Sequence, residues 1–321
     1  GAGVLMNCLL LYAIRRFTRK SLGSYKQLLT IFAAYDVFLT IMHAIVKPKV
    51  VIANTTTFGV VCEYDDRKVT SFYCACFTVP FTLMNIHFVY RFWSIRKPHL
   101  IPLFSDKKFI VFISCFPVVG FTVWYLLCIY VTTGEGPEIG KALLSAETGR
   151  RFGKVYSEGW LMMDHWSEDI SQFRLSFALL CFDVIMIGSF SVASTLGGLT
   201  FYYIKKADTI TMQANSMQLK LFIAVCAQTF VPLIFVYIPY FCVLNAPFFG
   251  LPVYFMDDAC MLLTSCFPAW DAVIMIVLMK DYRDGLIGMF RKKQPLMGAT
   301  TIMSTSVIPS AAVSSAISII H

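Results

Sequence analysis

The stretch His87-Phe88-Val89-Tyr90-Arg91-Phe92-Trp93 decides the fold of this chain. It closes a long apolar run, residues 69–90, and an arginine stands where the run stops. Further basic residues follow at once, beginning with Arg96 and Lys97. A helix of about 20 apolar residues crosses the hydrocarbon of a bilayer, and basic residues at its exit mark the cytoplasmic face. The stretch therefore predicts a membrane-spanning helix that ends at the cytoplasm.

The same pattern recurs along the chain. Of the 321 residues, 57% are hydrophobic and 14% are charged, whereas a soluble domain is about 25% charged. Further spans are predicted at about 28–46, 109–131, 176–203, 221–244 and 253–279. Residues 1–14 are read as the inner part of a first span whose outer part is missing. The runs lack the two-residue alternation of a membrane β-barrel. We therefore predict an all-α membrane protein, a seven-transmembrane helix bundle.

The basic residues set the predicted orientation. The loops after spans 1, 3 and 5, together with the C-terminal segment, hold 18 Lys and Arg residues, and the other loops hold nine. Since the richer side is cytoplasmic, the N-terminus is predicted outside and the C-terminus inside. Asn54 begins a glycosylation triplet in a predicted outer loop. The net charge of +8 is assigned to loops held against the lipid bilayer rather than to nucleic-acid binding, because no nucleic-acid motif accompanies it.

Two segments outside the spans carry predictions of their own. The outer loop 132–172 has the aromatic residues Tyr156, Trp160 and Trp166, and it is either a small folded lid or a solvated loop. Residues 281–293 have the pattern of an amphipathic helix on the inner leaflet, although Gly285 and Gly288 weaken it. Residues 1–291 are thus predicted to form one receptor domain. Residues 292–321, rich in Ser, Thr, Ala and Ile, are predicted to be a disordered cytoplasmic tail.

Seven spans, an outer N-terminus and an arginine that closes the third span describe a G-protein-coupled receptor. In detail the sequence resembles the nematode serpentine chemoreceptors, the Str family and its relatives, which include odorant receptors. The resemblance runs over residues 4–291 and is carried by Leu9–Ile14, Lys20–Lys26, Val46–Pro48, His87–Phe92, Gln228–Pro232, Tyr237–Pro239, Phe267–Asp271 and Tyr282–Arg283.

The resemblance implies olfactory-type signalling at the plasma membrane of a sensory-neuron cilium, with a small-molecule odorant and a heterotrimeric G protein as partners. Some residues depart from the patterns. Ala272 follows Asp271 where the family often has proline. Tyr90 replaces the acid that precedes the arginine in rhodopsin-like receptors. The second outer loop has no cysteine, so the usual bridge from span 3 to that loop cannot form.

Two groups of residues are candidates for signalling. Tyr90 and Arg91 are predicted to couple to the G protein, the alternative being an arginine that only snorkels to the interface. Acids within spans are costly and often functional. The predicted activation network is Asn7, Asp36, Pro232, Pro268 and Asp271. Its alternatives are separate helix–helix hydrogen bonds for the polar residues, and kinks without motion for prolines such as Pro232 and Pro239 in span 6.

A ligand pocket is predicted in the outer halves of spans 3, 5, 6 and 7, where a small lipophilic compound would find mostly apolar walls. The candidates, chosen by depth, are Phe72, Cys76, Phe182, Asp183, Met186, Phe235, Tyr240, Tyr254, Asp258 and Met261. Packing and lipid contact are the alternative roles for each of them. A retinal pigment is not predicted, because Lys280 lies at the inner end of span 7 and no lysine lies inside that span.

No enzyme and no cofactor are predicted. His43, His87, His99 and His165 are scattered, and no Ser/His/Asp or metal-ligand spacing connects them. The alternatives to a receptor that remain open are a membrane transporter, a ligand-gated channel subunit and a non-signalling partial receptor. Substrate flux or ion current without a G protein would distinguish the first two from a receptor.

Overall fold

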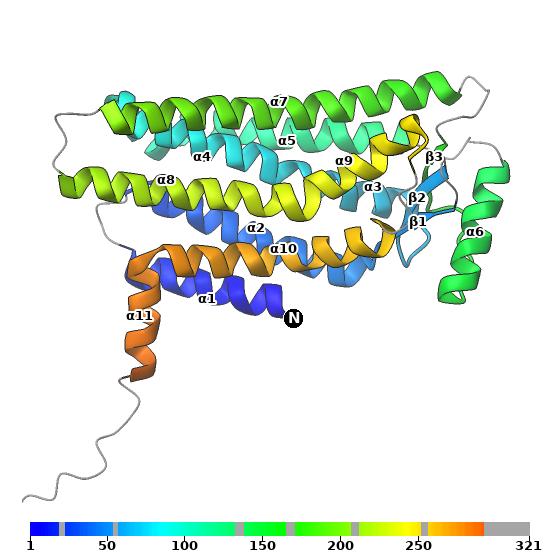
Figure 1. The fold of residues 1–321 in the computed structure, drawn as a ribbon, viewed down its shortest axis with the longest axis horizontal. Coiled ribbons are helices and arrows are strands. Elements are labelled where there is room, and N and C mark those ends of the chain that lie inside the picture. Colours follow the sequence, from blue (N-terminus) through cyan, green and yellow to red (C-terminus); the bar gives the residue numbers. More distant parts are fainter. Residues whose placement is uncertain are drawn as a thin grey trace, which may run out of the picture.

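The computed structural model describes residues 1–18, 23–53, 57–131, 138–164, 171–206, 212–251 and 256–291. Long helices run side by side along one axis and form a bundle (Figure 1). These helices are α1 (Ala2–Phe17), α2 (Tyr25–Val46), α3 (Arg67–Cys76) and α4 (Thr78–Arg96), α5 (Lys107–Tyr130), α7 (Ser171–Lys206), α8 (Met212–Pro232) followed by the π-helical turn η3 (Leu233–Tyr237) and α9 (Ile238–Asn245), and α10 (Met256–Leu278).

The described residues contain six helical stretches that are long and apolar enough to cross a membrane. They are Tyr25–Val46, Arg67–Arg96, Lys107–Tyr130, Ser176–Lys206, Gln218–Phe249 and Met256–Leu278. This confirms a helical, multi-span membrane protein. Helix α1, with 16 residues, packs against α2 and α10 within the same bundle. The orientation of the bundle in the membrane stays a prediction.

The third predicted span is divided into two helices. α3 ends at Cys76 and α4 begins at Thr78, with Phe77 between them. Pro80 has no N–H group, so it cannot donate to the carbonyl of Cys76 as a helix residue would. The hydroxyl of Tyr35 on α2 donates to this carbonyl instead, at 2.7 Å. The break is therefore stabilised by a neighbouring helix.

The sixth predicted span is also irregular. Pro232 ends α8, and Pro239 lies in the first turn of α9, so two helix hydrogen bonds are lost near one another. Between the two prolines the chain takes the wider π-helical turn of η3, a feature often found at functional sites. After this turn α9 bends away from the axis of α8 (Figure 1).

A small sheet covers one end of the bundle, and the prediction of an all-α fold is wrong in this respect. β1 (Lys49–Ile52), β2 (Thr57–Val61) and β3 (Leu161–Asp164) pair antiparallel in the order β1-β2-β3. Alternate residues face opposite ways. Phe58 and Met163 are partners in the register and pack toward the bundle, while Val61 and Met162 pack on the other face.

Helix α6 (Glu138–Phe152) lies against the outer face of the sheet, at the end of the bundle (Figure 1). The side chains of Tyr156 and Trp160 are fully buried there with Leu144. A Cβ on Gly59 would lie 2.8 Å from both Leu144 and Trp160, so this close packing needs glycine. Residues 138–164 therefore form a folded lid, which decides between the two predictions for this loop. Trp166 lies outside the described residues.

The opposite end of the bundle carries α11 (Lys280–Arg291), which runs across the helix axes (Figure 1), as well as the short helix η2 (Pro98–Ser105). Tyr282 on α11 is buried, and its hydroxyl hydrogen bonds with that of Thr18 at 2.9 Å. A Cβ on Gly285 would lie 2.6 Å from the ring of Phe17. The glycine that weakened the helix prediction thus lets α11 pack against the end of α1. The short helix η4 (Ala246–Phe249) follows α9, and the predicted tail lies outside the described residues.

Candidate functional site

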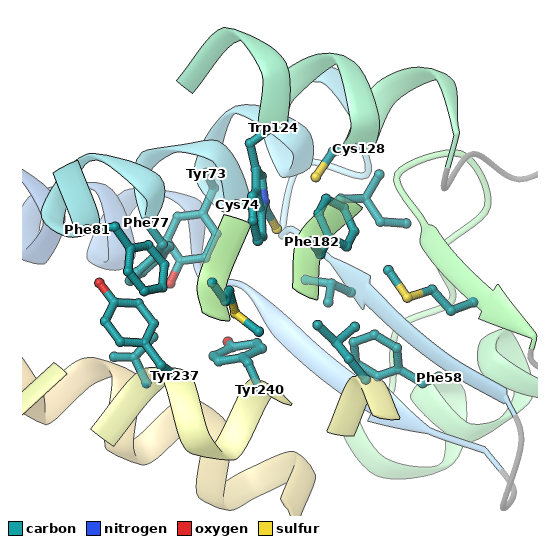
Figure 2. Close-up of a pocket in the computed structure, with 16 residues that line it drawn as sticks. Phe58, Tyr73, Cys74, Phe77, Phe81, Trp124, Cys128, Phe182, Tyr237 and Tyr240 are labelled. Carbon is teal, nitrogen blue, oxygen red and sulfur yellow. The ribbon is translucent and has the colours of Figure 1, made fainter. Parts of the chain in front are cut away.

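A cavity of about 790 Å³, open space at its mouth included, lies between the sheet and the helices of the bundle. Figure 2 shows the side chains that surround it. Its lining residues come from strands β2 and β3 of the sheet, from the six helical segments α3, α4, α5, α7, η3 and α9, and from Phe77 between α3 and α4. They are Phe58, Val60, Tyr73, Cys74, Phe77, Phe81, Trp124, Cys128, Leu161, Met163, Phe182, Met186, Val236, Tyr237, Tyr240 and Leu244.

The cavity walls are aromatic and uncharged. The rings of Phe81 and Tyr237 are stacked with their centroids 3.6 Å apart, and those of Trp124 and Phe182 are 4.3 Å apart (Figure 2). The hydroxyl of Tyr73 already bonds to Nδ1 of His43 at 2.7 Å. A site with such walls and few polar groups favours an apolar, uncharged molecule.

Three of the ten predicted pocket residues, Phe182, Met186 and Tyr240, line this cavity. Tyr254 lies outside the described residues, and the structure places the other six elsewhere. Phe72 is exposed beside Phe121, Cys76 is buried on α3, Asp183 accepts a hydrogen bond from Asn245, Phe235 lies beside Trp270, Asp258 is exposed near Arg151, and Met261 packs behind the cavity. Depth along the membrane selected these six, but the helix faces they occupy point away from the cavity.

Sequence reasoning missed the aromatic face of α3 and α4. Tyr73, Phe77 and Phe81 recur at every fourth residue, which is the spacing of one helix face. This spacing therefore could have predicted that the three side chains line the same space. Phe58 and Met163 left no such signal, because their position depends on strands that pair across about 100 residues of chain.

A buried polar centre lies deeper in the bundle. Asn7, Asp36 and Asp271 have side chains that are 1% exposed or less. Asn7 donates from Nδ2 to the carbonyl of Pro268 at 2.7 Å, which joins α1 to α10. Gln228 on α8 donates from Nε2 to Oδ2 of Asp271 at 3.4 Å. The structure thus brings together four of the five predicted network residues, and Pro232 lies one helical turn beyond Gln228.

The carboxyl groups of Asp36 and Asp271 face each other within hydrogen-bonding reach. Both oxygens of Asp36 and Oδ1 of Asp271 have no hydrogen-bond partner among the described residues. Two carboxyl groups this close cannot both carry an uncompensated charge. At least one of the two charges must therefore be neutralised, by a proton or by a bound cation.

Tyr237 connects the cavity to this centre. Its ring lines the cavity and stacks on Phe81. It also lies near enough to Asp36 for the two side chains to interact electrostatically. A molecule that moves the ring of Tyr237 would thereby change the surroundings of the buried carboxyl pair.

The predicted coupling residues lie near the α11 end of the bundle. Arg91 is only 2% exposed, and its guanidinium lies over the ring of Tyr25, 3.7 Å from the ring centroid. Tyr90 stacks on the same ring at 5.5 Å. Nε and Nη2 of Arg91 have no hydrogen-bond partner among the described residues. Arg91 is therefore held inside the bundle by aromatic packing, with unused donor groups.

Charged residues fasten the lid to the bundle. The carboxylate of Glu63 accepts hydrogen bonds from Nζ of Lys49 at 2.6 Å and from Nζ of Lys154 at 3.1 Å. These bonds lower the pKa of Glu63 to about 2. Arg151 on α6 forms an ion pair with Asp257 at the start of α10. The hydrogen bond to Asp257 raises the pKa of Arg151, so this cation stays charged.

Asp65 holds the loop between α6 and β3. Its carboxylate accepts hydrogen bonds from the backbone N–H groups of Ser157 at 2.9 Å, Glu158 at 3.1 Å and Gly159 at 2.8 Å. Partial burial acts to raise the pKa of Asp65, but these N–H groups more than offset it and lower the pKa. Glu63 and Asp65 thus connect the segment before α3 to the lid without a disulfide. The predicted glycosylation site Asn54 lies outside the described residues.

Comparison with known proteins places the chain in a family. The model of the serpentine type 7TM GPCR chemoreceptor Str family matches residues 1–287. Serpentine receptor class r-10 of Caenorhabditis briggsae is 28% identical over 303 residues, which is 90% of this chain and 87% of that protein. The Caenorhabditis elegans protein of the same name is 26% identical over 277 residues, 82% of this chain and 80% of that protein. The chain therefore belongs to the Str family of serpentine seven-transmembrane chemoreceptors.

Proposed function

We propose that this protein is an olfactory-type chemoreceptor that binds a small, uncharged odorant in the cavity and activates a heterotrimeric G protein. The observation that carries the proposal is the aromatic, uncharged cavity between the sheet and the bundle. Tyr237 lines this cavity and stacks on Phe81. Membership of a chemoreceptor family supports the same function. We propose the plasma membrane of a sensory cilium as its location.

We further propose that the sheet end of the bundle faces outward and that the end with α11 faces the cytoplasm. The distribution of Lys and Arg among the loops supports this orientation. It places the lid and the cavity in the outer half of the membrane protein. It also places Arg91 on the side where a G protein would bind.

In the proposed mechanism the odorant changes the packing of Phe81 and Tyr237. The change reaches Asp36 and Asp271, which then hold their proton or cation differently. The prolines and the π-helical turn around η3 give α8 and α9 a place to bend. A ligand shifts such an equilibrium only by its differential affinity for the two states. An odorant must therefore fit the rearranged cavity of the active state better than the cavity of the resting state.

At the cytoplasmic end, the proposed role of Arg91 requires its release from Tyr25. The buried arrangement, with the guanidinium over the ring of Tyr25, is assigned to the resting state. In the active state Arg91 would offer its unused donors to the G protein. Tyr90, which stacks on the same ring, would move with it.

A signalling screen tests this function. The receptor is expressed in cells with a Gα-linked readout and exposed to a panel of small odorants, alongside Arg91→Ala and the matched control Arg96→Ala, whose residue is exposed. We expect an odorant response that Arg91→Ala abolishes at equal surface expression and that Arg96→Ala keeps. A normal response in Arg91→Ala would reject the coupling role. Ion current or solute uptake without a G protein would instead favour a channel or a transporter.

A further inference from the structure

A second hollow, which we call the side groove, opens on the flank of the bundle next to the cavity. It has a volume of about 670 Å³, open space included, and lies between α4, α7 and the α8–η3–α9 segment. Its outer edge is formed by Ile187 on α7 and Ile238 on α9, which are 54% and 50% exposed. Both helices belong to candidate membrane spans, so this edge faces the hydrocarbon of the bilayer.

The side groove and the cavity share the same inner wall. Phe81, Met186 and Tyr237 line both of them. The stacked rings of Phe81 and Tyr237 (Figure 2) separate the two spaces together with the side chain of Met186. Methionine is unbranched and adapts readily to a changed space. Tyr237 is the last residue of the π-helical turn, where the backbone departs from regular helix geometry. The wall is therefore made of side chains that can move.

The lid covers the end of the cavity that faces the sheet. Phe58 and Leu161 on the cavity side of the sheet are 2% and 4% exposed. The outer face of the same sheet is covered by α6. Glu63 bonds to Lys49 and to Lys154, and Asp65 accepts a hydrogen bond from the N–H of Gly159, so both residues hold the lid in place. A molecule that came through the lid would have to break these contacts, whereas one that came through the side groove would only have to displace apolar side chains.

The geometry points to the side groove as the path by which an apolar, bilayer-dissolved ligand reaches the cavity, with Phe81, Met186 and Tyr237 as the gate. The occupant is the uncharged small molecule of the cavity itself, in transit from the lipid. The walls suit it, since Thr229, the polar residue of the groove, already donates its hydroxyl hydrogen to the carbonyl of Val225. This inference rests on the proposed ligand site. It adds that the lipid phase, not the water above the lid, supplies the ligand.

A photoreactive probe tests the path without a known odorant. Adamantyl diazirine, a small apolar molecule that dissolves in lipid, is mixed with the receptor in lipid nanodiscs and activated after increasing delays. Mass spectrometry then measures carbene insertion in the peptides that carry Trp124 and Phe182, which line the cavity and not the side groove. Insertion at exposed Leu262 on α10, in a different peptide and within a candidate membrane span, reports the probe in the surrounding lipid.

The decisive variant is Ile238→Trp, which fills the mouth of the groove and leaves the cavity walls unchanged. Its matched control is Ile234→Trp, one turn earlier, 54% exposed and outside both spaces. We expect Ile238→Trp to slow cavity labelling about tenfold or more, as a barrier higher by about 1.4 kcal/mol would do, with the same final extent. We expect Ile234→Trp to match the wild type. Should Ile238→Trp fail to fold, Ile187→Trp takes its place, with exposed Val184→Trp as control.

Two results would overturn the inference. Cavity labelling that is equally fast in Ile238→Trp and Ile234→Trp would show that the probe takes another path. Labelling of Leu262 without any labelling of Trp124 or Phe182 would show that the groove does not lead to the cavity. Neither result bears on the G-protein readout of the odorant screen. A failure of the path is thereby distinguished from a failure of the proposed function.

Discussion

The lid and the centre of the bundle both rely on carboxyl groups, but they surround them differently. At the lid, Glu63 faces Lys49 and Lys154, and Asp65 faces three backbone N–H groups. In the centre, Asp36 faces Asp271, another carboxyl group, and the remaining partner is the neutral amide of Gln228.

The difference separates a structural role from a functional one. Carboxylates that meet cations or N–H donors stabilise the arrangement that brings them together. Two carboxyl groups that meet each other inside a protein do the opposite unless a proton or a cation joins them. A chain keeps such a costly arrangement within a membrane mainly where it serves function. We therefore expect substitutions in the two regions to change stability in opposite directions, lowering it at the lid and raising it in the centre.

The largest effect is expected at Asp65. Asp65→Ala leaves the N–H groups of Ser157, Glu158 and Gly159 without their acceptor. Ser157 and Glu158 are exposed and can bond to water instead, but Gly159 is buried, and an unsatisfied buried donor costs about 1–3 kcal/mol. Asp65 also has a positive φ of 53°, a conformation that alanine adopts less readily than aspartate. We expect the lid to lose about 1–3 kcal/mol of stability. Hydrogen exchange at the amides of residues 157–159, measured in nanodiscs, should become about fivefold faster or more.

The control for this experiment is Asp258→Ala. The side chain of Asp258 is 80% exposed and approaches Arg151 only to 3.4 Å, and an exposed ion pair of this kind contributes about 0–1 kcal/mol. Exchange in the lid should change little in this variant. If Asp65→Ala behaved like the control, the lid would not depend on Asp65, and the contrast between the two regions would fail.

A smaller effect of opposite sign is expected in the centre. Asp271→Asn replaces one carboxyl group of the facing pair by an amide, which can donate a hydrogen bond to Asp36. Replacing buried ionic groups is often neutral or stabilising, and we expect a gain of about 1 kcal/mol, seen as a higher Tm in detergent. The odorant response should weaken, because the pair can no longer exchange its proton or cation.

Asp183→Asn is the matched control for the centre. Asp183 lies half-buried on α7 and accepts a hydrogen bond from Asn245 at 3.1 Å, with no second carboxyl group described beside it. The substitution should lower stability by about 0.5–1.5 kcal/mol, the usual contribution of one hydrogen bond. A Tm that falls in Asp271→Asn as it falls in Asp183→Asn would mean that the facing carboxyl groups carry no repulsion.

The centre was the part of the site that the sequence predicted best. Asn7, Asp36 and Asp271 are polar residues in apolar runs, and their depth in the membrane follows from counting residues along each run. The helices follow from the same runs, since length and hydropathy are local properties. The break at Phe77 was missed, although Pro80 was a signal for it.

The lid and the cavity were harder to predict, because they depend on long-range pairing. β1 and β2 are short, and β3, which pairs with β2, comes about 100 residues later in the chain. No local sequence pattern therefore predicts the sheet. The sheet in turn provides Phe58 and Met163 to the cavity. For the helices, depth alone could not decide which face turns inward. This is why Phe72 and Phe235 were predicted for the pocket but lie outside it.

The smallest effect, and the finest test of the contrast, is the response of the lid to acid. The bonds from Lys49 and Lys154 lower the pKa of Glu63 from 4.5 to about 2. The stabilisation is therefore fully present above pH 4.5 and is lost as the pH falls toward 2. Since Glu63 is largely solvated, the loss of stability should be modest.

Acrylamide quenching of Trp160, which is buried under α6, should increase as the pH falls through this range. The variant Trp160→Phe identifies the share of the fluorescence that comes from Trp160. Glu63→Gln should reduce the response and leave the part that comes from Asp65, whose lowered pKa makes it lose its own bonds in acid. If quenching in Glu63→Gln rose between pH 4.5 and 2 as steeply as in the wild type, the acid-sensitive contact would lie elsewhere, and Glu63 would not fasten the lid.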